Sequence, residues 1–453
     1  MADVVACVDF GSTFTKAALV EVPSGALVAT ADHRTTIDTD VLDGWDACRA
    51  ALAAADPRAD DAEVLACSSA GGGLRIAVVG NEELVTAEAG RRVALSSGGR
   101  VVHVTHGGLA RADVTTLRAT KPDVLLLVGG TDGGNEEVLV GCATTLARAR
   151  WRGPVVVAGN VDAQAEVAAL LTGSGTPHVL ADNVVPRIGV LAPESARAAI
   201  REMFLRHVIG GKHLSRRDSG ERFTAMVRGA TPDVVLTAVE LLADELGSDV
   251  VVVDVGGATT DVHSVVEVDP EDAGLSRQVV ATVPVSRTVE GDLGMRWSAI
   301  STVEEGVAAG LLDPALADAA AVRQADPSYL PGDALGADAD LAIAAAAVTV
   351  ALRRHAGRSQ VVFSPEGRVV ERSGKDLREV DLLVGSGGVL RHSDSPADGV
   401  LTRHLAADPG AGWQLPEHPR TVVDRDYVLA PVGLLAAAYP EAARSLARRL
   451  LRP

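Results

Sequence analysis

Residues 254–261 read DVGGATTD and directly follow four valines at 250–253. A run of valines is typical of a buried β-strand, and an acid followed by two glycines marks a tight turn at its end. Residues 9–16 read DFGSTFTK and follow the apolar stretch VVACV at 4–8. The chain therefore contains the same strand, acid and glycine turn twice.

The two segments align with an offset of 245 residues, which matches Asp9 with Asp254, Gly11 with Gly256, Thr15 with Thr260 and Val20 with Val265. Each turn leads into a second and a third predicted strand. Two related halves that face each other would place the two turns on opposite sides of one cleft. We predict halves at 1–245 and 246–453, with a small insertion near 68–110 between the glycine-rich stretches.

Short β-branched runs alternate with Ala/Leu-rich helical patterns along the chain, which indicates an α/β fold with a largely buried sheet. The segment 121–182 reads as strand–helix–strand–helix–strand, a parallel arrangement. The predicted strands are 4–9, 17–22, 26–31, 124–128, 155–158, 178–181, 250–254, 262–268, 278–284 and 381–384. The predicted helices are 44–55, 136–150, 162–172, 193–208, 233–246, 340–355 and 432–450, and 313–340 is expected to be helical or loose surface.

The composition excludes several classes of protein. The 453 residues carry a net charge of −18, so a broad basic footprint for nucleic acid is not expected. The four cysteines, Cys7, Cys48, Cys67 and Cys142, form no CxxC pair, which argues against a disulfide framework or structural zinc. The N-terminus lacks a signal-peptide pattern, and the apolar runs fall short of the ~20 residues that span a bilayer. We therefore expect a cytoplasmic protein without a membrane partner.

The turns carry a specific chemistry. Glycine lets the backbone approach a ligand closely, and successive N–H groups in a turn bind phosphate. Asp9 and Asp254 would repel phosphate unless a cation lies between them, and Mg²⁺ takes one or two carboxylates together with phosphate oxygens. Thr13 and Thr259 can add hydroxyl donors. The alternative, that both segments are ordinary β-turns rich in Asp and Gly, remains open.

A third glycine segment follows another apolar strand, DLLVGSGGVL at 381–390. Gly385, Gly387 and Gly388 would let a flat base lie against the backbone at a strand end, where open α/β sheets bind ligands. A tightly packed strand-to-helix turn is the alternative.

These three segments resemble the phosphate-1, phosphate-2 and adenosine motifs of the actin, Hsp70 and sugar-kinase ATPase superfamily. The resemblance implies two ribonuclease-H-like domains that clasp Mg-ATP. It assigns Asp9 and Asp254 to Mg²⁺ and to the attacking water, with Asp254 the residue that orients the water. It assigns the phosphate and adenosine contacts to Gly11, Ser12, Thr13, Gly256, Gly257, Thr259, Gly385, Gly387 and Gly388. The role of Lys16 stays open, and Ala258 stands where chaperones carry glycine.

Further segments resemble the GlmL/MutL family, which is associated with coenzyme-B12-dependent glutamate mutase. They include SSAGGGLRIAVVG (68–80), VTAEAGRR (85–92), LLLVGGTDGGN (125–135), VVVAGNVDAQAEV (155–167), LADNVVPRIGVL (180–191), RTVEGDLGMRWS (287–298) and DRDYVLAPVGLLA (424–436). The resemblance covers nearly the whole chain. It implies a chaperone-like, slow Mg-dependent ATPase that reactivates a cobalamin-dependent mutase or aminomutase by exchange of damaged cofactor.

Other functions on the same fold stay open. They are a small-molecule kinase, a hydantoinase- or oxoprolinase-like amidohydrolase, an iron–sulfur dehydratase activator and a scaffold that only binds ATP. The scattered cysteines disfavour the iron–sulfur activator. A base-off cobalamin motif D-x-H-x-x-G fails at Val266, so His263 is expected to be an ordinary strand residue. Asp132 and Asn135 could line the cleft or cap a helix, and Glu290, Asp292 and Arg296 could contact ribose, a partner or a helix start.

Overall fold

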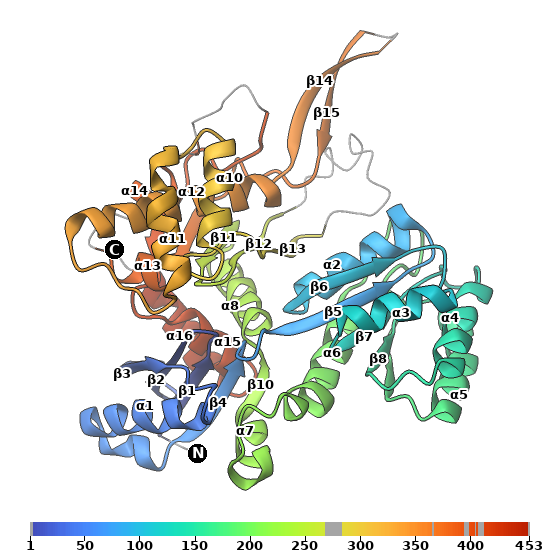
Figure 1. Ribbon diagram of the computed structural model, residues 1–453, viewed down its shortest axis with the longest axis horizontal. Helices are drawn as coiled ribbons and strands as arrows, with labels where there is room; N and C mark the ends of the chain where they lie inside the picture. The colour runs from blue at the N-terminus through green and yellow to red at the C-terminus, as the bar shows by residue number, and fades with distance from the viewer. Residues whose placement is uncertain are drawn as a thin grey trace.

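The computed structural model describes residues 3–267, 283–364, 367–393, 398–403, 405 and 412–451. Within these residues the chain forms three five-stranded sheets and one two-stranded hairpin. Figure 1 shows two of the sheets stacked one above the other, with the third beside them. Most of the predicted strand 278–284 lies outside the described residues.

The first sheet has the order β10-β4-β1-β2-β3. The strands β1, β2 and β3 form an antiparallel meander, and β4 and β10 continue the sheet parallel to β1. β1 is buried along its whole length, as its apolar sequence predicts. The bounds are β1 Val4–Phe10, β2 Phe14–Glu21, β3 Leu27–Arg34, β4 Glu63–Ser68 and β10 Val227–Ala230. Helices α1 (Val41–Ala55) and α7 (Glu221–Met226) belong to the same half.

The second sheet repeats this topology in the order β13-β12-β11-β16-β17. β11, β12 and β13 form the meander, and β16 and β17 run parallel to β11. The bounds are β11 Val250–Val255, β12 Thr260–Val265, β13 Val285–Glu290, β16 Leu382–Ser386 and β17 Arg420–Val423. The two sheets share one strand order, as expected for the two ribonuclease-H-like domains that the superfamily resemblance implies, so the predicted fold class is confirmed.

Helices α8 (Thr231–Leu246), α15 (Leu429–Leu435) and α16 (Pro440–Leu450) lie between the two sheets (Figure 1). Their apolar side chains share one hydrophobic core with residues of β1, β2 and β4 from the first sheet and of β11 and β16 from the second. The predicted helix 432–450 is therefore two helices, because Pro440 starts the second one. This shared layer ties the C-terminal segment to the first half.

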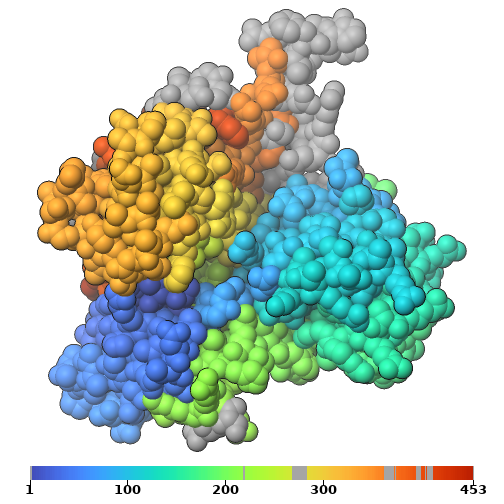
Figure 2. Space-filling model, viewed as in Figure 1, coloured from blue at the N-terminus to red at the C-terminus, as the bar shows by residue number. Residues whose placement is uncertain are grey.

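The insertion in the first half is larger than the predicted 68–110. A separate parallel sheet, β6-β5-β7-β8-β9, lies between β4 and β10 in the chain and extends from Leu74 to Leu180. The strands are β5 Leu74–Val79, β6 Gly99–Thr105, β7 Val124–Leu127, β8 Val155–Val157 and β9 His178–Leu180. The helices are α2 Glu88–Ser96, α3 Arg111–Thr120, α4 Glu137–Arg148, α5 Gln164–Ser174 and α6 Glu194–Met203. We call this part the inserted domain, and Figure 2 shows it beside both halves.

The second half is covered by α10 (Ala299–Ala308), α11 (Ala317–Ala325) and α12 (Ala334–His355), and the hairpin of β14 (Arg358–Ser364) and β15 (Gly367–Ser373) projects from it (Figure 1). The segments α13 (Gly388–Arg391) and α14 (Asp398–Leu401) complete it. By length and apolarity α12 could cross a membrane, but 61% of its most apolar window is buried within the protein, as in a core helix. All four cysteines are free and buried.

Candidate functional site

The two acid–glycine turns have the same backbone geometry. In the first half, the N–H of Gly11 donates to the carbonyl oxygen of Phe14 at 3.1 Å. In the second half, the N–H of Gly256 donates to the carbonyl oxygen of Thr259 at 2.9 Å. A Cβ on Gly11 would lie 2.6 Å from the Phe14 carbonyl oxygen, and a Cβ on Gly256 would lie 2.9 Å from the Thr259 carbonyl oxygen. Both turns therefore require glycine. The offset of 245 residues therefore holds for the turns as well as for the strands.

The two turns approach each other across the halves. A Cβ on Gly257 would lie 3.1 Å from Thr13 Oγ1. This hydroxyl is buried and finds no hydrogen-bond partner among the described residues. Ser12 beside it is exposed. Buried hydroxyls normally have a partner, so the Thr13 hydroxyl is available to bond a water molecule or a polar ligand between the turns.

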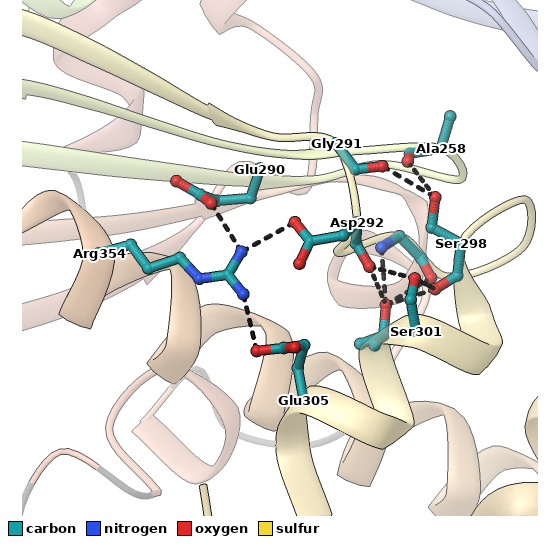
Figure 3. A network of polar contacts seen from close by, with 10 residues as sticks. Ala258, Glu290, Gly291, Asp292, Ser298, Ser301, Glu305 and Arg354 are labelled. Atoms are coloured by element: carbon teal, nitrogen blue, oxygen red, sulfur yellow. Dashed lines mark hydrogen bonds and ion pairs between the residues drawn. The ribbon is translucent and has the colours of Figure 1, made fainter. Parts of the chain in front are cut away.

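The second turn is held from behind by residues 291–298. The N–H groups of Met295 and Arg296 donate to the carbonyl oxygens of Gly256 and Gly257 at 3.0 and 2.8 Å. The Ser298 hydroxyl donates to the carbonyl oxygen of Ala258 at 2.9 Å (Figure 3). The carbonyl groups of the turn are thus bonded on the side that faces residues 291–298. The N–H groups that would bind phosphate lie on the opposite side of the turn.

Asp9 lies at the end of β1 and is nearly fully buried, with 3% of its surface exposed. Its Oδ1 accepts hydrogen bonds from the Thr231 hydroxyl at 2.5 Å and from Cys67 Sγ at 3.5 Å. Its Oδ2 accepts the Tyr427 hydroxyl at 2.6 Å and lies 4.0 Å from Lys16 Nζ. A buried carboxylate with this many donors is held in one orientation.

Asp254 occupies the matching place at the end of β11. Burial raises its pKa, the charges of Asp261 and Asp9 add to the rise, and Lys16 together with a hydrogen bond from Ser386 opposes it. The charges of Asp9 and Lys16 in the first half therefore act on Asp254 in the second half. The role of Lys16 was open in the sequence; its Nζ lies 4.0 Å from Asp9 Oδ2 and 3.8 Å from the centre of the Tyr427 ring.

The glycines of the third segment, 381–390, differ in their surroundings: two are packed against neighbouring residues and one has open space. A Cβ on Gly385 would meet the side chains of Leu390 and Leu401 at 2.8 Å, so this glycine is required by the core. Gly387 has φ +108° and lies against the carbonyl of Val255 on the neighbouring strand. Gly388 is exposed and has open space around its Cα. Of the three, only Gly388 has free space on its Cβ side.

Sequence reasoning missed three residues at the site: Thr231, Asp424 and Tyr427. The last two fall in DRDYVLAPVGLLA, a segment that carried the family resemblance but no assigned role. Asp424 is fully buried and accepts the N–H groups of Val428 and Leu429 at 2.8 and 3.1 Å, which caps the start of α15. A polar cluster directly before an apolar helix was the available signal.

Asp424 makes the folding stability depend on pH. Burial raises its pKa to about 6, although the two N–H groups and Arg391 oppose the shift. Because this folded-state pKa exceeds the ~3.9 of an unfolded chain, the ionised group destabilises the fold above about pH 6, and the penalty fades as the pH falls toward 4. Relative to Asp424→Asn, the wild-type free energy of unfolding should rise by about 2 kcal/mol between pH ~7.5 and ~4.5.

Denaturant unfolding of both proteins at the two pH values measures this change. Asp426→Asn is the control, because Asp426 is only partly buried and is paired with Arg449. A pH-independent difference between wild type and Asp424→Asn would contradict the prediction.

The side chains of the other residues singled out in the sequence make their contacts away from Asp9 and Asp254. Asp132 and Asn135 are in the inserted domain, where Asp132 Oδ1 accepts from Asn183 and Asn135 caps α4 through the N–H of Val138. Arg296 pairs with buried Asp340 at 3.1 Å. Arg354 pairs with Glu290, Asp292 and Glu305, each at 2.8 Å (Figure 3). His263 is a buried strand residue, as expected.

The comparison with known sequences gives two strong matches. A family model described as MutL protein matches residues 5–451. The chain is also 35% identical over 468 aligned positions to "Protein MutL" of Clostridium tetanomorphum, and the alignment covers 99% of both chains.

Solved structures show weaker likenesses. Nucleotide-free acetone carboxylase is 14% identical with a TM-score of 0.38, over 96% of this chain and 71% of that one. Component A of the (R)-2-hydroxyglutaryl-CoA dehydratase of Acidaminococcus fermentans is 9% identical with a TM-score of 0.29, over 99% of both chains. Xylulose kinase of Lactobacillus acidophilus is 13% identical with a TM-score of 0.32, over 99% of this chain and 89% of that one. TM-scores this low carry no functional conclusion.

Proposed function

The chain belongs to the MutL protein family, and from this premise we propose that it is a slow, Mg²⁺-dependent ATPase that reactivates a coenzyme-B12-dependent mutase. The partner would be glutamate mutase or a related aminomutase in the cytoplasm, and the effect would be exchange of damaged cobalamin. The observation that carries the ATPase part is the meeting of two glycine turns from two homologous halves around the orphan hydroxyl of Thr13.

The residues at the site fit a hydrated Mg²⁺. Asp9 and Asp254 offer one carboxylate each from facing halves, and a phosphate would lie between the glycine turns. Among the described residues no group of three or more His, Cys, Asp or Glu side chains could hold a metal alone. That suits Mg²⁺, which takes few protein ligands and completes its shell with phosphate and water. When bound, the ion would neutralise the charge of the phosphates.

The chain's own residues would supply the remaining chemistry. The N–H groups of Gly11 and Gly256 bond within their own turns, and the remaining N–H groups of the two turns would bind the phosphate oxygens. Lys16 would add a positive charge beside them. Asp254 would orient the attacking water and accept its proton, because burial keeps its carboxylate more basic than usual. Asp9, held by two hydroxyls, would fix the ion's position.

A chain of contacts between this site and the inserted domain supports the proposal that hydrolysis acts on a partner protein. Buried Arg287 of β13 contacts Asp261 Oδ1 at 3.0 Å, and Asp261 raises the pKa of Asp254. The same guanidinium donates to the carbonyl oxygens of Leu95 and Gly99 in the inserted domain at 3.0 and 3.3 Å. A shift of the second turn on hydrolysis would therefore be transmitted to the inserted domain, as in hinge-type switches.

The test is ATP hydrolysis with Mg²⁺, measured alone and with cyanocobalamin-inactivated glutamate mutase plus fresh coenzyme. We expect slow hydrolysis and a recovery of mutase activity that requires ATP, with none when the Asp254→Asn variant replaces the wild type. ATP hydrolysis without recovery of mutase activity would contradict the proposed partner. The next substrates to test would then be those of a small-molecule kinase or an amidohydrolase. No hydrolysis under either condition would contradict the ATPase.

A further inference from the structure

Tyr427 connects the C-terminal segment of the chain to the acid of the first turn. It lies between β17 and α15, and its hydroxyl donates to Asp9 Oδ2 at 2.6 Å across 418 positions of sequence. Its ring carries Lys16 Nζ at 3.8 Å from the ring centre. One side chain of the second half thus contacts both charged residues of the first turn.

The backbone holds Tyr427 in an unfavourable conformation to make this contact. Its φ is +56°, in the left-handed region that residues with a side chain rarely adopt. Buried Asp424 fixes the segment by accepting the N–H groups of Val428 and Leu429. Strained residues of this kind persist where the surroundings over-determine them, and they cluster at functional sites.

The contact completes the orientation of Asp9. The Thr231 hydroxyl, from the start of α8, donates to Oδ1, and the Tyr427 hydroxyl donates to Oδ2. Two donors on opposite oxygens fix the rotation of the carboxylate about its own axis. Oδ1 also accepts Cys67 Sγ, whereas Oδ2 accepts only the Tyr427 hydroxyl and keeps a further lone pair, through which Asp9 can still contact an ion or its water shell.

We propose that Tyr427 is a positioning residue that acts through Asp9 on the binding of Mg²⁺–nucleotide. This inference rests on the proposed ATPase function and deepens it. Loss of the hydroxyl would leave Asp9 Oδ2 without its hydrogen-bond donor and the carboxylate held only through Oδ1, whereas the phosphate-binding turns would stay as they are. The defect should therefore concern the Mg²⁺-dependent part of binding and the turnover rate.

The chain offers a matched control. The Tyr439 hydroxyl also donates to a carboxylate at 2.6 Å, Glu63 Oε2, but that contact is exposed and lies outside the site. We would compare Tyr427→Phe and Tyr439→Phe by calorimetric titration with ADP, with and without Mg²⁺, and by steady-state ATP hydrolysis. Thr231→Val removes the hydroxyl on the other oxygen and serves as a second variant if Tyr427→Phe does not fold.

For Tyr427→Phe we expect about a 10-fold smaller gain in ADP affinity on adding Mg²⁺ and a kcat about 10- to 100-fold lower, as for other residues that orient a metal ligand. Binding of Mg²⁺-free ADP should change less than about 3-fold, because the turns are intact. Tyr439→Phe should match the wild type. A Tyr427→Phe protein with the wild-type Mg²⁺ effect overturns the inference alone, whereas a wild type that neither binds nor hydrolyses Mg-nucleotide overturns the proposed function and the inference with it.

Discussion

The Asp254→Asn variant is expected to hydrolyse ATP about 10²- to 10³-fold more slowly than the wild type, the usual loss when a general base is removed. Asparagine keeps the shape of the side chain and can still accept the hydrogen bond from Ser386, but it cannot take a proton from water. The KM for Mg-ATP should change only a few-fold. Steady-state hydrolysis over a range of ATP concentrations separates the two parameters.

Folding provides an independent check on this variant. Burial raises the pKa of Asp254, so the ionised carboxylate opposes folding, and a neutral amide should leave the melting temperature unchanged or higher. Asp381→Asn is the control, since Asp381 is exposed just before the neighbouring strand β16, far along the sheet from the turn. A kcat within about 3-fold of the wild type would contradict the role of Asp254 as base.

The Asp9→Asn variant should show a different defect. An amide nitrogen cannot accept a hydrogen bond, so either the Tyr427 or the Thr231 hydroxyl loses its acceptor. We expect about a 10- to 100-fold higher Mg²⁺ requirement for hydrolysis, because the variant removes the carboxylate that we propose as an Mg²⁺ ligand. The free energy of unfolding should fall by about 1–3 kcal/mol, the cost of leaving a buried polar group unpaired.

A Mg²⁺ titration of ATP hydrolysis and denaturant unfolding measure the two effects. Asp3→Asn is the matched control, because Asp3 is exposed and directly precedes the same strand β1. A variant with normal Mg²⁺ dependence would show that Asp9 is only a structural acid. Asp9→Asn combined with Tyr427→Phe should be no worse than Asp9→Asn alone, since both act through one carboxylate.

Local sequence signals predicted the halves better than the inserted domain. The sequence predicts β7, β8 and β9 as a parallel set, but it does not separate them from the rest of the first half. Periodicity indicates that a segment is a strand but not which sheet it joins, because sheet membership depends on distant partners. The short strands β5 and β6, which begin the separate sheet, lie inside the range 68–110 and were read as a minor insertion.

The glycine motifs show a similar limit. Gly385, Gly387 and Gly388 have one sequence signature, but the structure gives the first two to packing and leaves open space only at Gly388. A glycine that makes room for a leucine and a glycine that makes room for a ligand look the same in a sequence. Only the neighbouring side chains distinguish them.

The sequence by itself determined the internal repeat, the two acid–glycine turns and the family, because strands and tight turns depend on residues that are adjacent in the chain. The tertiary structure decided what each charge contacts. Asp9 takes its hydrogen bonds from Thr231 and Tyr427, which lie 222 and 418 positions away. Those contacts exist because α8 and the segment before α15 pack between the two sheets, and no local pattern specifies that layer.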